Sequence, residues 1–226
     1  MKLARRFFSL SLATIVALAM SSSARAGIIL NFGQNGTSTP VTATASGPGS
    51  TAIAGVEAVT IAGIAAAVAT PVNAFLSLNL NSVAATAAAT TIGPVTLISQ
   101  EYTGTFSITQ NSNGSGTNYL SGTVDLFAAG IAGGASLSMQ SILNPVFTSS
   151  VIPLVPGPTS ANFSLTGIAT PPGLSLSGGT IAPFTSSVTG TFSGHAVPEP
   201  SSMALLGIGG VGWFVRGLRR RRTTVV

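Results

Sequence analysis

Polar and apolar residues alternate with a period of two along much of the chain. In the clearest run, Leu76, Leu78 and Leu80 alternate with Ser77, Asn79 and Asn81. Successive side chains of a β-strand point to opposite faces, so such a run predicts a strand with one buried and one polar face. The same pattern occurs in five further runs, at Tyr102, Gly104, Phe106 and Ile108; at Leu120, Gly122, Val124 and Leu126; at Leu137 and Met139; at Phe163 and Leu165; and at Val188, Gly190 and Phe192. We therefore expect an all-β body, an antiparallel β-sandwich-like arrangement.

The connections between these runs are less uniform. The Asn, Ser and Gly residues at 111–116 predict a hairpin turn, and the prolines at 153–158 and 171–173 predict loops. Residues 52–70 are rich in alanine, which permits a helix, but their Val, Ile, Thr and Gly residues show no helical stripe and favour strands. The sequence Gly-Thr-Phe-Ser occurs at 104–107 and again at 190–193, a match too short to establish a duplication.

The N-terminus has the order of a secretory signal peptide. Lys2, Arg5 and Arg6 precede an apolar run over residues 7–20, and the small residues Ala24 and Ala26 precede Gly27. This order predicts a signal peptide helix over residues 1–26, cleaved before Gly27. An uncleaved anchor helix and, because of Arg5-Arg6, twin-arginine export are the alternatives, but the short apolar run and the lack of any cofactor signature favour general secretion.

The C-terminus predicts a single transmembrane helix at about residues 201–218. Arg216 is the only charged residue of this segment, and as a helix the segment would span roughly 27 Å, close to the thickness of a thin bilayer core. Arg219, Arg220, Arg221 and Arg222 follow it directly. Because positive charges stay on the cytoplasmic side, the body should lie outside the cytoplasm. A buried helix of a soluble domain, the alternative, would have to lie beside these arginines.

Three features in fixed order complete this end of the chain: Pro198-Glu199-Pro200, the apolar span, and the arginine cluster. Together, over residues 198–222, they resemble the PEP-CTERM sorting signal of exported proteins from Gram-negative bacteria that make exopolysaccharide. The resemblance implies recognition by an exosortase, with Pro198, Glu199 and Pro200 as the recognition element and Arg219, Arg220, Arg221 and Arg222 as the cytoplasmic retention element. It also implies transient anchoring in the inner membrane before the protein reaches the cell surface or the extracellular space. Arg216 and residues 223–226 depart from the usual pattern.

Charge is confined to the two ends of the chain. The formal net charge is +5, but all nine Lys and Arg residues lie at or before Arg25 or at or after Arg216. The body, residues 27–197, contains only Glu57, Glu101 and Asp125 as charged residues, which makes nucleic acid a poor partner. With about 170 residues it has the size of one domain. Its low net charge and recurring apolar positions weigh against disorder, and without cysteine its stability must come from burial and hydrogen bonding.

The body offers little for catalysis or metal binding. His195 lies near the end of the last predicted strand, as a solvated strand-end or linker residue does. Glu101 and Asp125 lie on neighbouring predicted strands and could face each other as a glycosidase pair, but both fall on polar faces, which favours solvated surface carboxylates. The Asn-rich segment 111–118 has no carboxylate to hold a hard cation. We therefore expect no catalytic residue, no metal and no cofactor, and a protein that is not an enzyme.

These observations favour a structural or adhesive protein of the cell surface or biofilm matrix. Its partners would be the secretion machinery, an exosortase, the membrane and exopolysaccharide. The alternative is a carbohydrate-binding module, in which Tyr102 and Tyr119 are the candidate aromatic platforms for a sugar ring.

Overall fold

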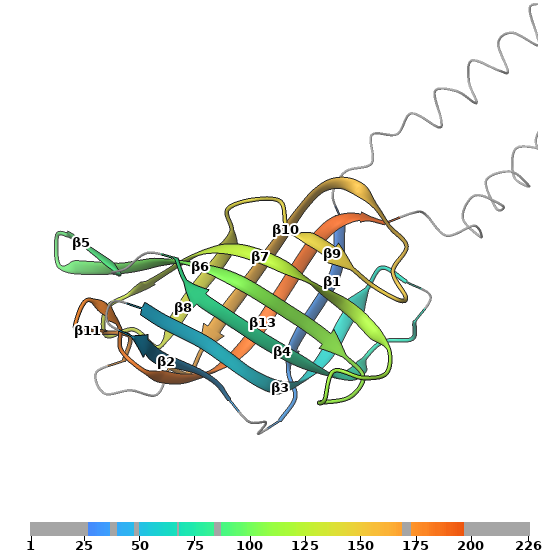
Figure 1. The fold of residues 1–226 in the computed structure, drawn as a ribbon, viewed down its shortest axis with the longest axis horizontal. Coiled ribbons are helices and arrows are strands. Elements are labelled where there is room, and N and C mark those ends of the chain that lie inside the picture. Colours follow the sequence, from blue (N-terminus) through green and yellow to red (C-terminus); the bar gives the residue numbers. More distant parts are fainter. Residues whose placement is uncertain are drawn as a thin grey trace, which may run out of the picture.

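The computed structural model describes residues 27–36, 40–47, 50–66, 68–83, 87–168 and 173–196. Its regular elements in these ranges are all β-strands, and every paired strand is antiparallel (Figure 1). The strands are β1 Gly27–Gln34, β2 Val41–Gly47, β3 Ser50–Ile64, β4 Val72–Ser82, β5 Ala88–Ile92, β6 Val95–Thr109, β7 Asn118–Ile131, β8 Ser136–Ser141, β9 Val146–Thr148, β10 Leu154–Thr166, β11 Leu176–Ser177, β12 Thr180–Ile181 and β13 Phe184–Ala196. The prediction of an all-β antiparallel body is therefore confirmed.

The main sheet closes on itself. Its strands follow the order β1, β3, β4, β6, β7, β8, β10 and β13, and β13 pairs again with β1. When the strands are followed from β6 through β4, β3, β1, β13, β10 and β8 to β7, the long β6–β7 pairing joins the last strand to the first. The sandwich of two facing sheets is thus not confirmed, because the described strands of the body lie in one continuous sheet apart from the small β11–β12 hairpin. Side-chain alternation is the same in both architectures, so it does not distinguish them.

One position in the closed sheet is shared by two strands. β1 and β2 both pair with β3 and β13. Along β3, the pairing with β1 ends at Val59 and the pairing with β2 begins at Ala54, so the residues between them are paired with neither strand. Glu57 lies on β3 in this interval with its side chain fully buried, and its Oε2 accepts a hydrogen bond from the backbone N–H of Val188 on β13 at 3.1 Å. The carboxylate therefore supplies an acceptor where no ladder carbonyl is present, which explains a buried acidic residue in an apolar interior.

Apolar side chains fill the inside of the closed sheet. The largest feature is an aromatic cluster in which Phe192 contacts four other rings, those of Phe32, Phe106, Phe147 and Phe163. The two Gly-Thr-Phe-Ser sequences meet here, since the rings of Phe106 and Phe192 stack with centroids 4.6 Å apart. Gly190 makes room for the cluster, because a Cβ at this position would lie 2.4 Å from Cε1 of Phe32.

The local predictions were largely right. Residues 111–116 lie in the turn of the β6–β7 hairpin. The strand expected over 52–70 is present at 52–64, within β3, whereas the described residues 65, 66 and 68–70 lie in the connection to β4. The loop expected over 153–158 is wrong for residues 154–158, which begin strand β10. The pairing of β10 with β13 shifts register between Val155 and Ser160. Pro156 and Pro158 lie in this bulge, where no ladder hydrogen bond needs their missing N–H groups. Pro171 and Pro172 lie outside the described residues.

Candidate functional site

The outer face of the sheet has a shallow hollow of about 300 Å³ over β1, β13, β10 and β8. Its polar lining consists of Asn31, Ser138, Asn162, Ser164, Thr189 and Thr191, and Phe32, Phe163 and Gly190 complete it. None of these described lining residues is charged. The hollow is therefore a neutral surface of amide and hydroxyl groups.

Strand register arranges these side chains in two rows. Asn31, Thr191 and Asn162 are neighbours on β1, β13 and β10, and Thr189, Ser164 and Ser138 are neighbours on β13, β10 and β8. Neighbouring strands are about 4.8 Å apart, so each row presents polar groups at a regular spacing across the strands. Short side chains leave the surface hollowed. The sequence alone gave no signal for this site, because its residues come from distant segments.

The polar side chains of the hollow do not bond to one another or to their neighbours. Among the described residues, none of the six polar side chains has a hydrogen-bond partner, although Oδ1 of Asn31 is itself buried and so out of reach of a ligand. Polar side chains near the β6–β7 turn, in contrast, form hydrogen bonds with one another. There Nδ2 of Asn118 donates to Oγ of Ser121, whose hydroxyl also bonds Thr148, both at 2.8 Å. The hollow thus keeps hydrogen-bonding capacity that other polar surfaces of the body use internally.

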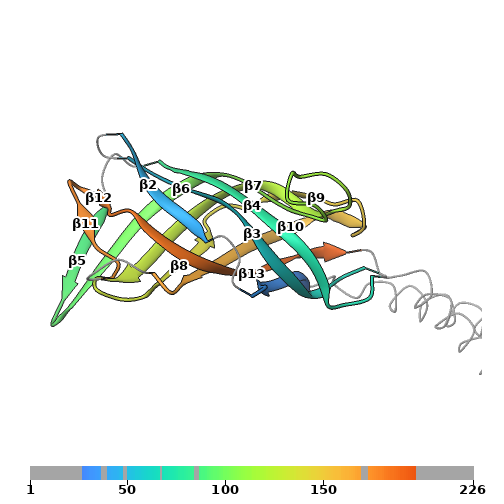
Figure 2. The same ribbon diagram turned by 90° about the horizontal axis from the view of Figure 1, so that it is seen from below.

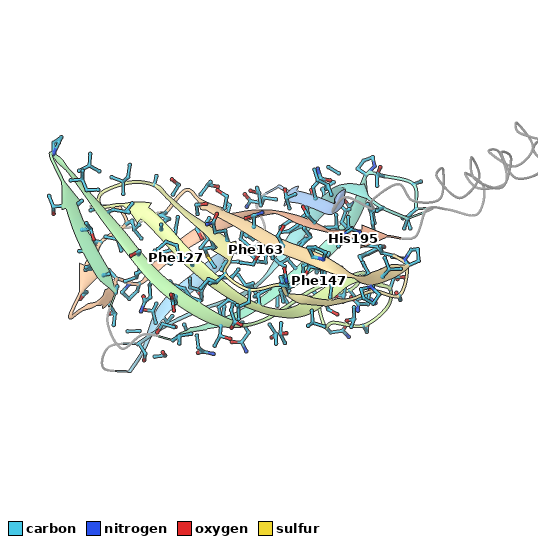
Figure 3. The ribbon with its side chains drawn as sticks, turned by 90° about the horizontal axis from the view of Figure 1, so that it is seen from above. Phe127, Phe147, Phe163 and His195 are labelled. Atoms are coloured by element: carbon cyan, nitrogen blue, oxygen red, sulfur yellow. The ribbon has the colours of Figure 1, made fainter. Side chains whose placement is uncertain are left out.

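The carboxylates considered as a catalytic pair lie away from this hollow. Glu101 on β6 is opposite Phe127 on β7, and Asp125 is opposite Thr103, so the two acids are diagonal neighbours on the outer face. They lie on neighbouring strands with polar faces outward, as the sequence predicts. His195 lies near the other end of the body, toward the end of β13, beside Gly157 of β10 (Figure 3). The structure does not bring the histidine together with either acid.

The two tyrosines are parts of the core. Tyr102 is fully buried and Tyr119 is 7% exposed, so neither presents a ring to a sugar. Tyr102 Oη donates a hydrogen bond to Oε1 of Gln100 at 3.2 Å, inside the closed sheet. The choice of these residues as sugar platforms is therefore wrong: Tyr102 lies in phase with the inward-facing Phe106, and alternation places both on the buried side.

Tyr102 also makes stability depend on pH. Burial raises the pKa of its phenol well above the ordinary value, and a hydrogen bond with Thr51 lowers it by less. Since the folded protein holds this proton more tightly than the unfolded chain, the stabilisation is complete below about pH 10 and is lost as the pH rises further. We expect the free energy of unfolding to fall above about pH 10 with a Tyr102 contribution of up to about 1.4 kcal/mol per pH unit.

Denaturant unfolding at about pH 9 and about pH 11 measures this effect. In the variant Tyr102→Phe, the free energy of unfolding should fall less between these two pH values, because the part that Tyr102 contributes is removed. An equal alkaline loss in both proteins would show that Tyr102 does not cause it.

The residues of the sorting signal and of the signal peptide cleavage site lie largely outside the described residues. This applies to Pro198, Glu199, Pro200, the arginines 219–222, Ala24 and Ala26, whereas Gly27 begins β1. Among the described residues there is no helix with the length and apolar character needed to cross a membrane. The signal peptide and the C-terminal helix therefore stay predictions from the sequence.

Comparison with known proteins identifies the C-terminal segment. Residues 196–222 match the PEP-CTERM protein-sorting motif, which confirms the resemblance drawn from the Pro-Glu-Pro sequence, the apolar span and the arginines. No curated protein and no solved structure shows significant similarity to the chain. The motif implies export, sorting at the membrane and processing by an exosortase.

Proposed function

We propose that the protein is a non-enzymatic structural or adhesive component of the cell surface or extracellular matrix. The single observation that carries this proposal is the neutral hollow, whose six polar side chains have no hydrogen-bond partner in the part of the chain that the structure describes. Such a surface suits contact with a neutral, hydroxyl-rich polymer, because it matches many donors and acceptors without selecting for charge. Exopolysaccharide is the proposed polymer, in keeping with the sorting signal.

The described carboxylates support a role without catalysis. Glycoside hydrolysis needs two carboxyl groups placed on either side of a bound sugar. Glu101 and Asp125 lie instead on the outer face of β6 and β7, away from the residues that line the hollow. Glu57 is fully buried and bonds the backbone of β13, a structural role.

A carbohydrate-binding module is the second candidate, and the same hollow favours it. The two candidates differ in selectivity: a module binds one glycan in preference to others, whereas an adhesive surface binds many neutral glycans weakly. The hollow has no exposed tyrosine or tryptophan among its lining residues, and without a stacking ring each contact contributes little. A glycan array distinguishes the candidates, since selective binding would establish the module and broad weak binding the adhesive surface.

The variant Thr191→Leu tests the hollow directly. A larger apolar side chain without a ring fills part of the hollow and offers no hydrogen bond, so retention on host exopolysaccharide should fall about tenfold, the loss of one or two hydrogen bonds. The matched control is Thr105→Leu, because Thr105 is the same residue in the other Gly-Thr-Phe-Ser sequence, is exposed, and lies outside the hollow. Co-sedimentation of each exported protein with the polysaccharide measures retention. Equal retention of the two variants would refute a role for the hollow.

A further inference from the structure

Strand β13 runs directly into the sorting motif. It ends at Ala196, at the end of the body opposite to β5 and β11 (Figure 2). The match to the sorting motif begins at this same residue, and only Val197 separates it from Pro198. Consecutive Cα atoms are about 3.8 Å apart, so the Cα of Pro198 lies within about 8 Å of that of Ala196 in any conformation. The recognition element is therefore joined to the sheet by a single residue.

The strand end, residues 194–196, is held less firmly than the rest of β13. Among the described strands, its first residue is paired with β1 alone and its other two residues with β10 alone. Ser193, directly before it, is paired with both strands. The pairing changes here because each neighbour has a bulge, at residues 28–30 of β1 and 155–160 of β10. Since a bulge disrupts the ladder locally, fewer hydrogen bonds hold the strand end in the sheet.

Release of the strand end would leave the core of the body in place. Phe192, at the centre of the aromatic cluster, precedes the strand end and is paired with β1 and β10. Gly194 faces inward as Phe192 does, but it has no side chain to withdraw from the interior. Local openings of this kind need much less free energy than global unfolding. The strand end can therefore separate while the rest of the sheet stays closed.

An exosortase that acts at the Pro-Glu-Pro element needs access to the chain just before it. Extended peptides are commonly bound through their main-chain hydrogen-bonding groups, and in the strand end these groups face β1 and β10. Neighbouring strands are about 4.8 Å from β13, so they also occupy the space beside the chain that an enzyme would enter. Pairing in the sheet and binding to the enzyme therefore exclude each other for these residues.

We propose that the exosortase binds the strand end as part of its substrate, and that residues 194–196 leave the sheet before the chain is processed. The rate of processing then follows the fraction of molecules in which the strand end is released. This inference rests on the sorting motif and does not depend on what the hollow binds.

A contact between His195 and the bulge of β10 helps to hold the strand end. The imidazole ring lies against Gly157 so closely that a Cβ at this glycine would be 2.5 Å from Cδ2 and 3.0 Å from Cγ of the ring. Figure 3 shows His195 at this end of the body. Because Cγ is the first atom of the ring, a side chain at position 157 would displace the whole ring from the bulge.

A disulfide across the strand end tests the proposal in the full chain in its host. The protein has no cysteine, and Val155 and His195 are directly opposed and both partly exposed. The double variant Val155→Cys, His195→Cys therefore places two thiols within the Cα separation that a disulfide requires. The control, Thr166→Cys with Ser187→Cys, joins the same two strands at the other end of their ladder. After mild oxidation of the exported protein, labelling of free thiols separates locked from unlocked chains.

In the first double variant, the processed protein should contain almost no locked chains, and dithiothreitol should restore processing of the unprocessed chains. In the control, locked chains should be processed as fully as unlocked chains. Equal processing of locked and unlocked chains of the first double variant would overturn the proposal.

Loosening of the strand end should have the opposite effect. The variant Gly157→Ala displaces the His195 ring, and the loss of a contact worth about one hydrogen bond should speed processing about three- to tenfold. This substitution leaves the sequence of the strand end and of the sorting motif unchanged. The control is Gly33→Ala, because a Cβ at Gly33 meets no atom of the described residues within 4 Å. Pulse labelling followed by cell fractionation measures the rates, and equal rates for the two variants would show that release of the strand end does not control processing.

Discussion

The variant Phe192→Ala should lower the free energy of unfolding by about 3–5 kcal/mol, a large part of the total stability expected for one domain. Phe192 is fully buried and its ring contacts those of Phe32, Phe106, Phe147 and Phe163. Truncation leaves a cavity that the neighbouring rings cannot fill, because each is held on a different strand, β1, β6, β9 or β10. Denaturant unfolding of the exported protein, followed by circular dichroism, measures the loss.

The matched control is Phe127→Ala. Phe127 is 38% exposed on the outer face of β7, so the same substitution removes less buried surface there and should cost well below half as much. Similar losses for the two variants would contradict the placement of Phe192 at the centre of the core.

Replacement of Pro198, Glu199 and Pro200 by alanine should abolish processing almost completely. The match over residues 196–222 implies that an exosortase recognises this segment. Two prolines hold the chain extended and remove backbone donors, which suits presentation of a short linear element next to the membrane. Unprocessed protein should therefore accumulate in the inner membrane, as measured by cell fractionation and immunoblotting.

Alanines at Ser201 and Ser202 provide the control, since they lie directly beside the recognition element and within the same match. Their release should equal that of the unmodified protein. Normal release of the Pro-Glu-Pro variant would mean that this element is not what the sorting machinery reads.

Local alternation was enough to predict strands β4, β6, β7, β8, β10 and β13 with their buried faces, but it gave no signal for β1, β2, β5 and β9. Leu76, Leu78 and Leu80 lie inside β4 as the pattern requires, and Val188 and Phe192 lie inside β13. Closure of the sheet could not be predicted in this way, because it rests on pairings between distant segments, such as β1 with β13. The burial of Glu57 could not be predicted either, because the group that bonds its carboxylate is the backbone N–H of Val188, on a strand far along the chain.

The two ends of the chain and its body differ in what their sequences reveal. The sorting signal is a continuous motif, and the match over residues 196–222 confirms it. The hollow is assembled by register from Asn31, Ser138, Asn162 and their neighbours, each of which alone resembles the polar face of any other strand. From the sequence, Tyr102 and Tyr119 were the candidate platforms for a sugar ring, but both are buried in the structure.

The most direct test of the central claim, that this is an exported body released by processing at its sorting signal, is the intact mass of the protein recovered from outside the cell. The mass should correspond to a chain that begins at Gly27 and ends near Pro198, Glu199 and Pro200, without the arginines 219–222. Recovery of extracellular protein that still ends at Val226 would contradict the claim.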